Sequence, residues 1–533
     1  MLDYAIRNCH ICDGSGTPCY YGNLGIKDKR IAQMNNLKDE ARKTIDIAGL
    51  IVSPGFIDMH SHADKDFSLL VHPHSEAKVM QGVTTEVIGN CGMSAYPLGK
   101  DQSTKDNSLI FDIPKGIEKN WKDLEGYFNK LLSRGTAVNV VALVGHGTLR
   151  EAVMGFDNRK PTSHEMERMK QLLREAFQQG AFGLSTGLVY PPGVYADLEE
   201  IMELTKIVSE YGGIYASHLR NQNKNLVQCV EEIIEIGQQT KASVQISHLK
   251  IMGEKYKTNI GRVLVLMEKA QRNGININAD QYPYIAGSST TTVLLPPWVR
   301  EGGPTIMLKR LKSDACRIQI KKDLKVEIEG WMSLVEVIGW DNINISSVSS
   351  DKNKDLEGHS LLEIAEMRGQ SVEDALFDLL IEENGSVRHI AFTTSEEEVK
   401  KIMKNPLVMI GSDGIDVENG KPHPRLYGTF PRILGKYVRD EKVIPLEEAV
   451  RKMTSLPAKK LGIKDRGLLK EGMMADIVIF DPSRIRDKAS FDTPTAFPEG
   501  IKYVFINGEP VIENGVITNK LPGMMLDRND CKK

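Results

Sequence analysis

Two kinds of hydrophobic pattern alternate along most of the chain. Short runs of Val, Ile, Leu and Ala are separated by longer segments whose apolar residues return every three or four positions. The first pattern is typical of strands that are buried on both faces, and the second is typical of amphipathic helices. The pattern predicts strands at residues 51–58, 84–91, 138–145, 181–186, 213–218, 243–248, 275–281 and 407–413.

Segment 163–179 is the clearest predicted helix. Thr162 and Glu165 form a capping-box pattern at its start, Gly180 follows its end, and Asp197 offers a similar start for the next helix. Its apolar stripe consists of Met166, Met169, Leu172, Leu173, Ala176 and Phe177. Eight strand and helix units in alternation predict an α/β fold, a (β/α)₈ TIM barrel over residues 51–467.

Both ends of the chain depart from this alternation. Residues 1–50 and roughly 468–520 contain short predicted strands joined by turns, and Asn507-Gly508 is a hairpin signal between two of them. We therefore expect residues 1–50 and 468–533 to combine into one small β-sandwich domain beside the barrel.

Residues 286–350 interrupt the barrel pattern between its seventh and eighth strands. The segment is rich in charge, Gly and Pro and contains a short predicted strand near residues 342–348. An insertion of this size is either a lid over the active site or a peripheral decoration. Its sequence favours neither.

Composition indicates an ordinary soluble globular protein. The 533 residues are 41% hydrophobic and 26% charged, and the formal net charge is -3. This balance gives no electrostatic reason to expect a nucleic acid or a membrane as partner. The first residues lack the pattern of a signal peptide, and no apolar run approaches the roughly 20 residues of a membrane helix. We expect a cytoplasmic protein.

The cysteines support that expectation. There are seven, an odd and sparse set that suits free thiols in a reducing compartment. Cys9 and Cys12 have the spacing of a redox or zinc half-site, but no second pair follows at zinc-ribbon spacing. The apolar residues around them favour an ordinary strand.

Potential metal ligands stand at the ends of several predicted strands. His60 and His62 follow the first strand, and residues i and i+2 of a strand share a face. Imidazole and thiolate are ligands that suit zinc. The carboxyl ends of barrel strands form the face where barrel enzymes have their active sites. The sequence therefore predicts a catalytic metal centre with the ligands His60, His62, Cys91, His218, His248 and Asp413.

Asp413 has a second predicted task. Water that attacks a substrate needs a base to take its proton, and the departing group needs an acid. A carboxylate at the last strand, facing the metal, can serve as both in turn. The alternative is a turn residue before Gly414 or a helix N-cap.

The pattern of His60, His62, His218, His248 and Asp413 resembles that of the metal-dependent amidohydrolase superfamily. The segment Gly89-Asn90-Cys91-Gly92 narrows the resemblance to one family within it. Many members bridge two metals with a lysine from the fourth strand, but Ala181–Ser185 has none. A cysteine from the second strand in its place resembles the D-aminoacylases, the N-acyl-D-amino-acid deacylases. The similarity runs nearly end to end, through residues 145–150, 185–193, 247–250, 280–284, 423–432, 453–458 and 472–478.

The resemblance implies two metal positions. Cys91, His218 and His248 would hold a tightly bound Zn²⁺. His60 and His62 would form a second, weaker position that shares Cys91 and Asp413.

The resemblance also implies how a substrate is held. Arg425 would bind its free carboxylate, which fits the bidentate geometry of guanidinium and carboxylate. Tyr190, Lys250, Tyr282 and Ser288 would contact its carboxylate and amide. No ligand role is assigned to His146. The histidines interpreted as ordinary residues are His72, His74, His164, His359 and His389.

The resulting hypothesis is zinc-dependent hydrolysis of N-acyl-D-amino acids, small molecules, to a carboxylate and a free D-amino acid. The alternatives are a cyclic-amide hydrolase of the dihydroorotase or hydantoinase kind, and a non-catalytic scaffold with the same fold. The preferred side chain and acyl group, the occupancy of the second metal position and the oligomeric state stay open.

Overall fold

A computed structural model describes residues 1–98, 116–326, 328, 331, 333–417 and 420–532. Eight parallel strands form its central sheet, which runs in the order β16-β12-β11-β10-β9-β8-β7-β6. The strands are β6 (Phe56–Asp58), β7 (Val83–Ile88), β8 (Asn139–Gly145), β9 (Gly183–Gly187), β10 (Ile214–His218), β11 (Ser243–Ile246), β12 (Ile277–Gln281) and β16 (Val408–Ile410). This is the predicted α/β barrel.

The barrel closes between its first and last strands, just past their ends. Ser61 bridges Gly414 in parallel register. The amide of Asp413 donates to the carbonyl of His60 at 2.7 Å, and that of His62 donates to the carbonyl of Gly414 at 3.2 Å. Closure therefore brings His60, His62 and Asp413 to one seam, although they lie about 350 residues apart.

The helices around the barrel follow the predicted signals. Helix α5 (Ser163–Gln178) begins with the capping box of Thr162 and Glu165, and Asp197 caps α6 (Leu198–Glu210). Helices α7 (Leu226–Thr240) and α8 (Thr258–Arg272) cover the next two units, and their apolar faces pack into the main core. No helix in the described part of the chain is long and apolar enough to cross a membrane.

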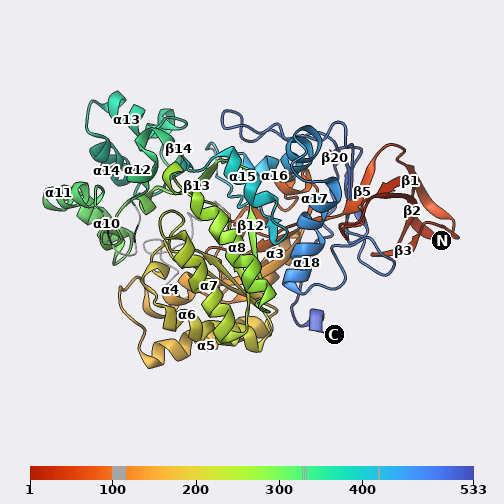
Figure 1. Ribbon diagram of the computed structural model, residues 1–533, viewed down its shortest axis with the longest axis horizontal. Helices are drawn as coiled ribbons and strands as arrows, with labels where there is room; N and C mark the ends of the chain where they lie inside the picture. Colours follow the sequence, from red (N-terminus) through yellow and green to blue (C-terminus); the bar gives the residue numbers. More distant parts are fainter. Residues whose placement is uncertain (99–115, 327, 329–330, 332, 418–419, 533) are drawn as a thin grey trace.

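Strands from both termini form one nine-stranded sheet, the terminal sheet, which lies at one end of the molecule (Figure 1). Its order is β20-β19-β18-β17-β5-β1-β2-β3, with β4 paired to β1. Along β17 (Ile477–Phe480), Ile477 and Ile479 face the core of the terminal sheet, whereas Val478 and Phe480 face the barrel core. The other strands are β1 (Leu2–Ile11), β2 (Tyr20–Lys27), β3 (Arg30–Met34), β4 (Ala41–Asp46), β5 (Ile51–Pro54), β18 (Ile501–Ile506), β19 (Glu509–Glu513) and β20 (Val516–Ile517).

The structure corrects the first predicted strand. Residues 51–58 form two strands in different sheets, since β5 joins the terminal sheet and β6 begins the barrel. Gly55 separates them, and a Cβ there would lie only 2.2 Å from Oγ1 of Thr84. The chain needs glycine at this crossing. Cys9 lies within β1, as the ordinary-strand interpretation predicts.

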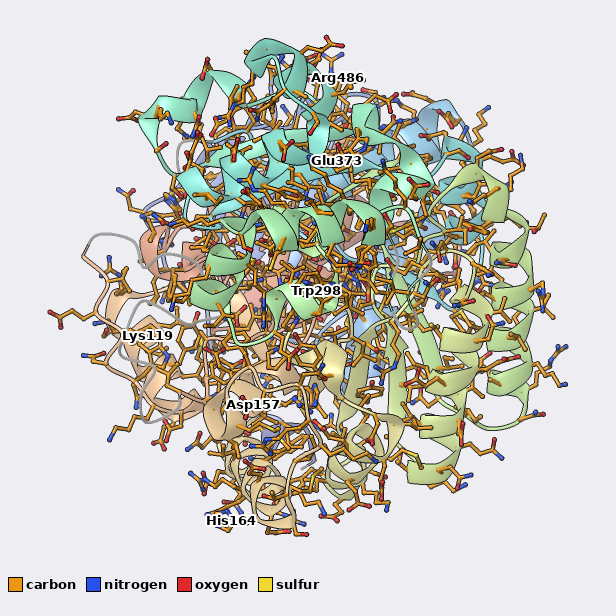
Figure 2. All side chains as sticks on the ribbon, turned by 90° about the vertical axis from the view of Figure 1, so that its left-hand side faces the viewer. Lys119, Asp157, His164, Trp298, Glu373 and Arg486 are labelled. Carbon is orange, nitrogen blue, oxygen red and sulfur yellow. The ribbon has the colours of Figure 1, made fainter. Side chains whose placement is uncertain are left out.

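An inserted layer stands between β12 and β16, at the opposite end of the molecule from β1–β3 (Figure 1). Its three-stranded sheet consists of β13 (Ala286–Thr290), β14 (Ile343–Val348) and β15 (Val387–Phe392), and its apolar core is separate from that of the barrel. The layer therefore continues past residue 350, where the sequence places its end. Figure 2 faces this layer, with Trp298 of α9 (Pro297–Arg300) and Glu373 of α14 (Val372–Glu382) labelled on it.

Candidate metal centre and active site

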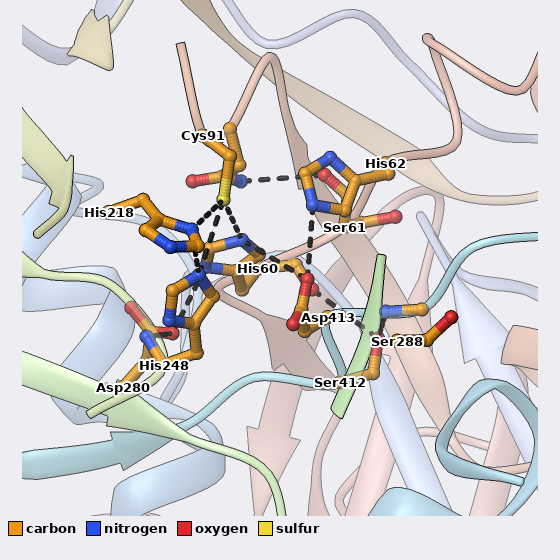
Figure 3. Close-up of polar contacts among 12 residues, drawn as sticks. His60, Ser61, His62, Cys91, His218, His248, Asp280, Ser288, Ser412 and Asp413 are labelled. Carbon is orange, nitrogen blue, oxygen red and sulfur yellow. Dashed lines mark hydrogen bonds and ion pairs between the residues drawn. The ribbon is translucent and has the colours of Figure 1, made fainter. Parts of the chain in front are cut away.

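All six predicted metal ligands converge at the carboxyl ends of the barrel strands (Figure 3). The thiol sulfur of Cys91 lies 3.3 Å from Nε2 of His60, 3.3 Å from Nε2 of His248 and 3.6 Å from Nδ1 of His218. Oδ1 of Asp413 lies 3.0 Å from Nε2 of His62 and 3.5 Å from Nε2 of His60. His60 is common to two groups of close ligand atoms, one with Cys91 and His248 and one with His62 and Asp413.

The chemistry of these donors fits a bound zinc ion. In a tetrahedral zinc site, bonds of 2.0–2.3 Å place neighbouring donor atoms roughly 3.3 to 3.8 Å apart. The three distances from the sulfur of Cys91 fall in that range. Nε2 of His248 and Nδ1 of His218 face each other at 2.9 Å, closer than two ligands of one zinc ion, so they would separate slightly when an ion binds. Several lone pairs therefore point at one small volume, an arrangement that a cation would satisfy.

Protonation of the histidines agrees with metal binding. Burial lowers the pKa of His218 and His248 well below the ordinary value, and it lowers the pKa of His62 to about 3. These rings are therefore neutral, which is the form that ligates metals. Burial also opposes a charge on His60, but Cys91, Asp280 and Asp413 together raise its pKa well above the ordinary value. The negative groups around His60 thus favour a cation.

Three of the predicted ligands have a positive φ, a backbone conformation that is uncommon for any residue but glycine. The φ angles are 55° at Cys91, 37° at His248 and 51° at Asp413. Such a conformation costs on the order of 1–3 kcal/mol at a non-glycine residue and persists where the surroundings enforce it. Residues of this kind are concentrated at functional sites, and here they turn ligands into the barrel mouth.

The loop that carries Cys91 is held by close backbone packing. Gly89 and Gly92 both have positive φ. A Cβ on Gly89 would lie 2.0 Å from the carbonyl oxygen of Leu143, and one on Gly92 would lie 2.5 Å from the amide of Gly187. Any larger residue would push the loop away from β8 and β9. The Gly-Asn-Cys-Gly motif is therefore the sequence that lets the thiol reach the histidines.

A buried charged network joins the first and last barrel strands beneath Asp413. Asp58 Oδ1 accepts from the amide of Ser412 at 2.8 Å and from the amide of His60 at 3.2 Å. Lys78 donates to Asp58 Oδ2 at 2.6 Å and to the hydroxyl of Ser412 at 2.9 Å. Burial opposes the charge on Lys78, but Asp58 and Glu86 raise the pKa of its ammonium above the ordinary value. No sequence pattern marks this network, because its members look like isolated charges along the chain.

Arg425 lies directly beside Asp413. Its Nη1 is 2.8 Å from Oδ2 of Asp413, and its guanidinium carbon lies 4.6 Å from the ring centre of Tyr282. Burial favours a protonated Asp413, but Arg425 and the neighbouring histidines lower the pKa of this carboxyl well below the ordinary value. Asp413 is consequently ionised, as a general base must be.

One cavity connects the metal-binding residues to the inserted layer. Four of the predicted substrate contacts line it, namely Tyr190, Lys250, Tyr282 and Ser288. Tyr190 Oη lies 3.2 Å from Oγ of Ser289, and Lys250 Nζ lies 3.0 Å from Nδ1 of His248. The inserted layer contributes walls from β13 and β15 and from Trp331 and Leu334. It therefore shapes the cavity and is more than a peripheral decoration.

Sequence reasoning missed two cavity residues on β15. Arg388 and His389 both line the cavity, although the sequence analysis treats His389 as an ordinary residue. Burial lowers the pKa of His389 to about 3, so its ring is neutral. No local pattern marks them, because the pairing of β15 with β13 alone brings them to the site. Nε2 of His146, a residue left without a role, lies 2.7 Å from Oε1 of Glu200.

Comparison with known proteins identifies the family. A model of the amidohydrolase family matches residues 43–312 and 357–512. A D-aminoacylase of Alcaligenes xylosoxydans xylosoxydans is 37% identical over 531 residues, which cover 99% of this chain and 98% of the relative. The chain belongs to the amidohydrolase family.

Solved structures of similar amidohydrolases resemble the structure of this chain over nearly its full length. An N-acyl-D-glutamate deacylase from Bordetella bronchiseptica, crystallised with zinc and a phosphonate that mimics the tetrahedral intermediate, is 33% identical. Its TM-score is 0.82, with 99% of each chain covered. A D-aminoacylase with a binuclear metal centre is 35% identical, with a TM-score of 0.84 and coverage of 99% of this chain and 100% of that chain.

Proposed function

We propose that this amidohydrolase hydrolyses the amide bond of N-acyl-D-amino acids, releasing a carboxylate and a free D-amino acid. One observation carries the proposal: the ionised carboxylate of Asp413 lies between the His60–His62 pair and Arg425, at the mouth of the barrel. Full-length similarity to D-aminoacylase and to N-acyl-D-glutamate deacylase supports it.

The proposed cofactor is zinc. Cys91, His218 and His248 would hold one ion tightly, and His60 and His62 would hold a second, weaker divalent ion together with Cys91 and Asp413. Bound zinc supplies Lewis acidity, which polarises the amide carbonyl and makes water a nucleophile near neutral pH.

Asp413 is the proposed catalytic residue. Its ionised carboxylate takes a proton from the attacking water. It then donates this proton to the nitrogen of the leaving amine, which is too basic to depart as an anion. Arg425 keeps Asp413 ionised before substrate binds. A substrate carboxylate that shares the guanidinium weakens this hold and makes Asp413 a stronger base.

Arg425 also places the substrate. A guanidinium can bind a carboxylate through two parallel hydrogen bonds, which defines the direction of the Cα substituents. The guanidinium of Arg425 contacts the ring of Tyr282 and the carbonyl of Ser288, and both residues line the cavity together with Lys250. Tyr190 would donate a hydrogen bond from its hydroxyl to the oxyanion that develops as the carbonyl is attacked. The D preference comes from the similarity to deacylases.

The two alternatives are less well supported. A cyclic amide such as a hydantoin has no free carboxylate for Arg425, and the fourth strand lacks the lysine typical of those enzymes. A scaffold without activity has no need of six convergent ligands, three of them with positive φ. A cytoplasmic location stays a prediction, supported by the sparse cysteines, all of which are free.

The test is amine release from N-acetyl amino acids, supplied separately as D and L forms to zinc-supplemented protein. The proposal expects hydrolysis of D forms only, and the best side chain defines the specificity. Hydrolysis of hydantoins or dihydroorotate instead would replace it with the cyclic-amide alternative. If protein with verified zinc hydrolyses none of these substrates, the proposal is overturned.

A further inference from the structure

Asp280 is a buried carboxylate that contacts two of the proposed zinc ligands. It stands in β12, is 1% exposed, and lies beneath His60 and His248 (Figure 3). Its Oδ1 lies 3.1 Å from Nδ1 of His60 and accepts from the backbone amide of His248 at 2.8 Å. Its Oδ2 accepts from Nε2 of Gln245 at 2.8 Å.

The contact with His60 determines which ring nitrogen is available. Oδ1 is an acceptor, so Nδ1 of His60 must carry a proton to bond with it. In the neutral ring that ligates a metal, Nε2 then keeps the lone pair, and this atom faces Cys91 and Asp413. A carboxylate behind a ligand histidine orients the ring and strengthens it as a ligand.

The contact with His248 acts on the backbone. His248 has a φ of 37°, a conformation that is uncommon for any residue but glycine. Its amide donates to the same oxygen of Asp280 that faces His60. Oδ1 of Asp280 thus contacts both the ring of His60 and the backbone turn at His248. This turn directs Nε2 of His248 toward the sulfur of Cys91.

We infer that Asp280 is a positioning residue that organises both metal positions together, by orienting His60 and by holding the turn at His248. The inference rests on the zinc ligands of the proposed function and names no contact with substrate. Loss of Asp280 is therefore expected to weaken zinc binding at both positions, most at the position of His60 and His62.

Asp280→Asn isolates the role of the charge. An asparagine oxygen can still accept at the Oδ1 position, and its amide would then face Gln245. Oε1 of Gln245 is buried without a partner, so a flip of the Gln245 amide would satisfy the new donor. The variant keeps shape and hydrogen bonds and removes only the negative charge. Asp280→Ala removes both.

Zinc affinity is measured by competition with a chelator, using zinc alone as the probe. Altered carboxylates behind metal ligands typically cost 10- to 100-fold in affinity, and we expect about 10-fold weaker zinc in Asp280→Asn and more in Asp280→Ala. Excess zinc is expected to restore part of the activity of Asp280→Asn. Cobalt substitution gives a second readout, since the thiolate band of Cys91 would shift if the ligand geometry changes.

The control is Asp476→Asn, a buried carboxylate that pairs with Arg466 at 3.0 Å on the far side of the barrel. It is expected to lose stability but to keep zinc affinity and the cobalt spectrum. Unchanged affinity and spectrum in a folded Asp280→Asn variant would overturn the inference. If wild-type protein cleaves no N-acyl-D-amino acid but Asp280→Asn still weakens zinc, the proposed function fails and the inference stands.

Discussion

In the terminal sheet, the non-glycine residues with positive φ are all Asn or Asp, whereas at the metal-binding end of the barrel they include a cysteine and a histidine. Among the described residues, the non-glycine positions of the terminal sheet with positive φ are Asn8, Asp28, Asn35, Asn507 and Asn514. Asn and Asp tolerate this conformation, so the sheet takes its turns from local preference. At the barrel mouth, Cys91 and His248 bring proposed ligand atoms together, and the surrounding fold enforces their backbone.

The two regions also use buried cysteines, carboxylates and arginines differently. Each contains a buried Asp–Arg contact, Asp413 with Arg425 in the barrel and Asp476 with Arg466 where the terminal sheet meets it. Each contains a buried cysteine. Because both regions contain buried cysteines and buried Asp–Arg contacts, burial and pairing alone do not identify a functional residue. A position beside other unsatisfied ligand atoms does, and matched substitutions can separate the two cases.

The largest expected effect is that of Cys91→Ala. Alanine has no ligand atom, and water does not replace a thiolate at equal affinity, so the variant should lose both zinc and activity. Elemental analysis and amine release measure these. Cys9→Ala is the matched control, because burial raises the pKa of Cys9 to about 12 and keeps it a thiol. It should keep full zinc, and full zinc in Cys91→Ala would remove Cys91 from the ligands.

Asp413→Asn should follow, with turnover reduced by about a thousandfold or more. General acid–base catalysis contributes roughly 10²- to 10⁴-fold, and asparagine cannot carry the proton. Zinc held by Cys91, His218 and His248 should remain, as elemental analysis would check. The control Asp476→Asn should lower stability with little change in turnover. Equal turnover losses in the two variants would mean that Asp413 acts only through the fold.

Arg425→Lys should reduce kcat/KM by roughly 10- to 100-fold on N-acetyl-D-amino acids. Lysine is a point charge and cannot bind a carboxylate bidentately; hydrogen bonds to charged groups contribute about 1.5–3 kcal/mol. The same reaction on substrates whose carboxylate is converted to an amide should be affected much less. Arg466→Lys is the control. A loss of the same size on both substrates would assign Arg425 to Asp413 rather than to the substrate.

The smallest expected effect lies in the terminal sheet. Asp28→Gly should change the free energy of unfolding by less than about 0.5 kcal/mol, because glycine adopts positive φ freely. Asp28→Ala should destabilise by about 1 kcal/mol, since alanine does not. Urea unfolding measures both, and zinc content should stay constant. Equal stability of the two variants would show that the backbone at Asp28 carries no strain.

Much of this molecule could be predicted from its sequence, and the failures have specific causes. The barrel strands and α5 follow from local periodicity and capping. The six predicted ligands are recognised by their places at strand ends, and five of them fall in the two groups of close ligand atoms. The prediction of a single first strand is wrong because β5 and β6 are both buried. The two strands form one continuous apolar run in the sequence, which hides the change of sheet at Gly55. The predicted insertion is too short because the sequence of β15 resembles that of any buried strand, and only its pairing with β13 and β14 assigns it to the inserted layer.

Local sequence is enough to define which residues become strands or helices and which ligand atoms the chain offers, because periodicity, caps and donor chemistry are local properties. Folding in three dimensions is what places Asp280 behind His60 and His248, joins Lys78 to the barrel seam, and brings Arg388 and His389 to the cavity. These contacts join residues far apart in the chain, and their energy depends on burial and distance, which no local pattern records.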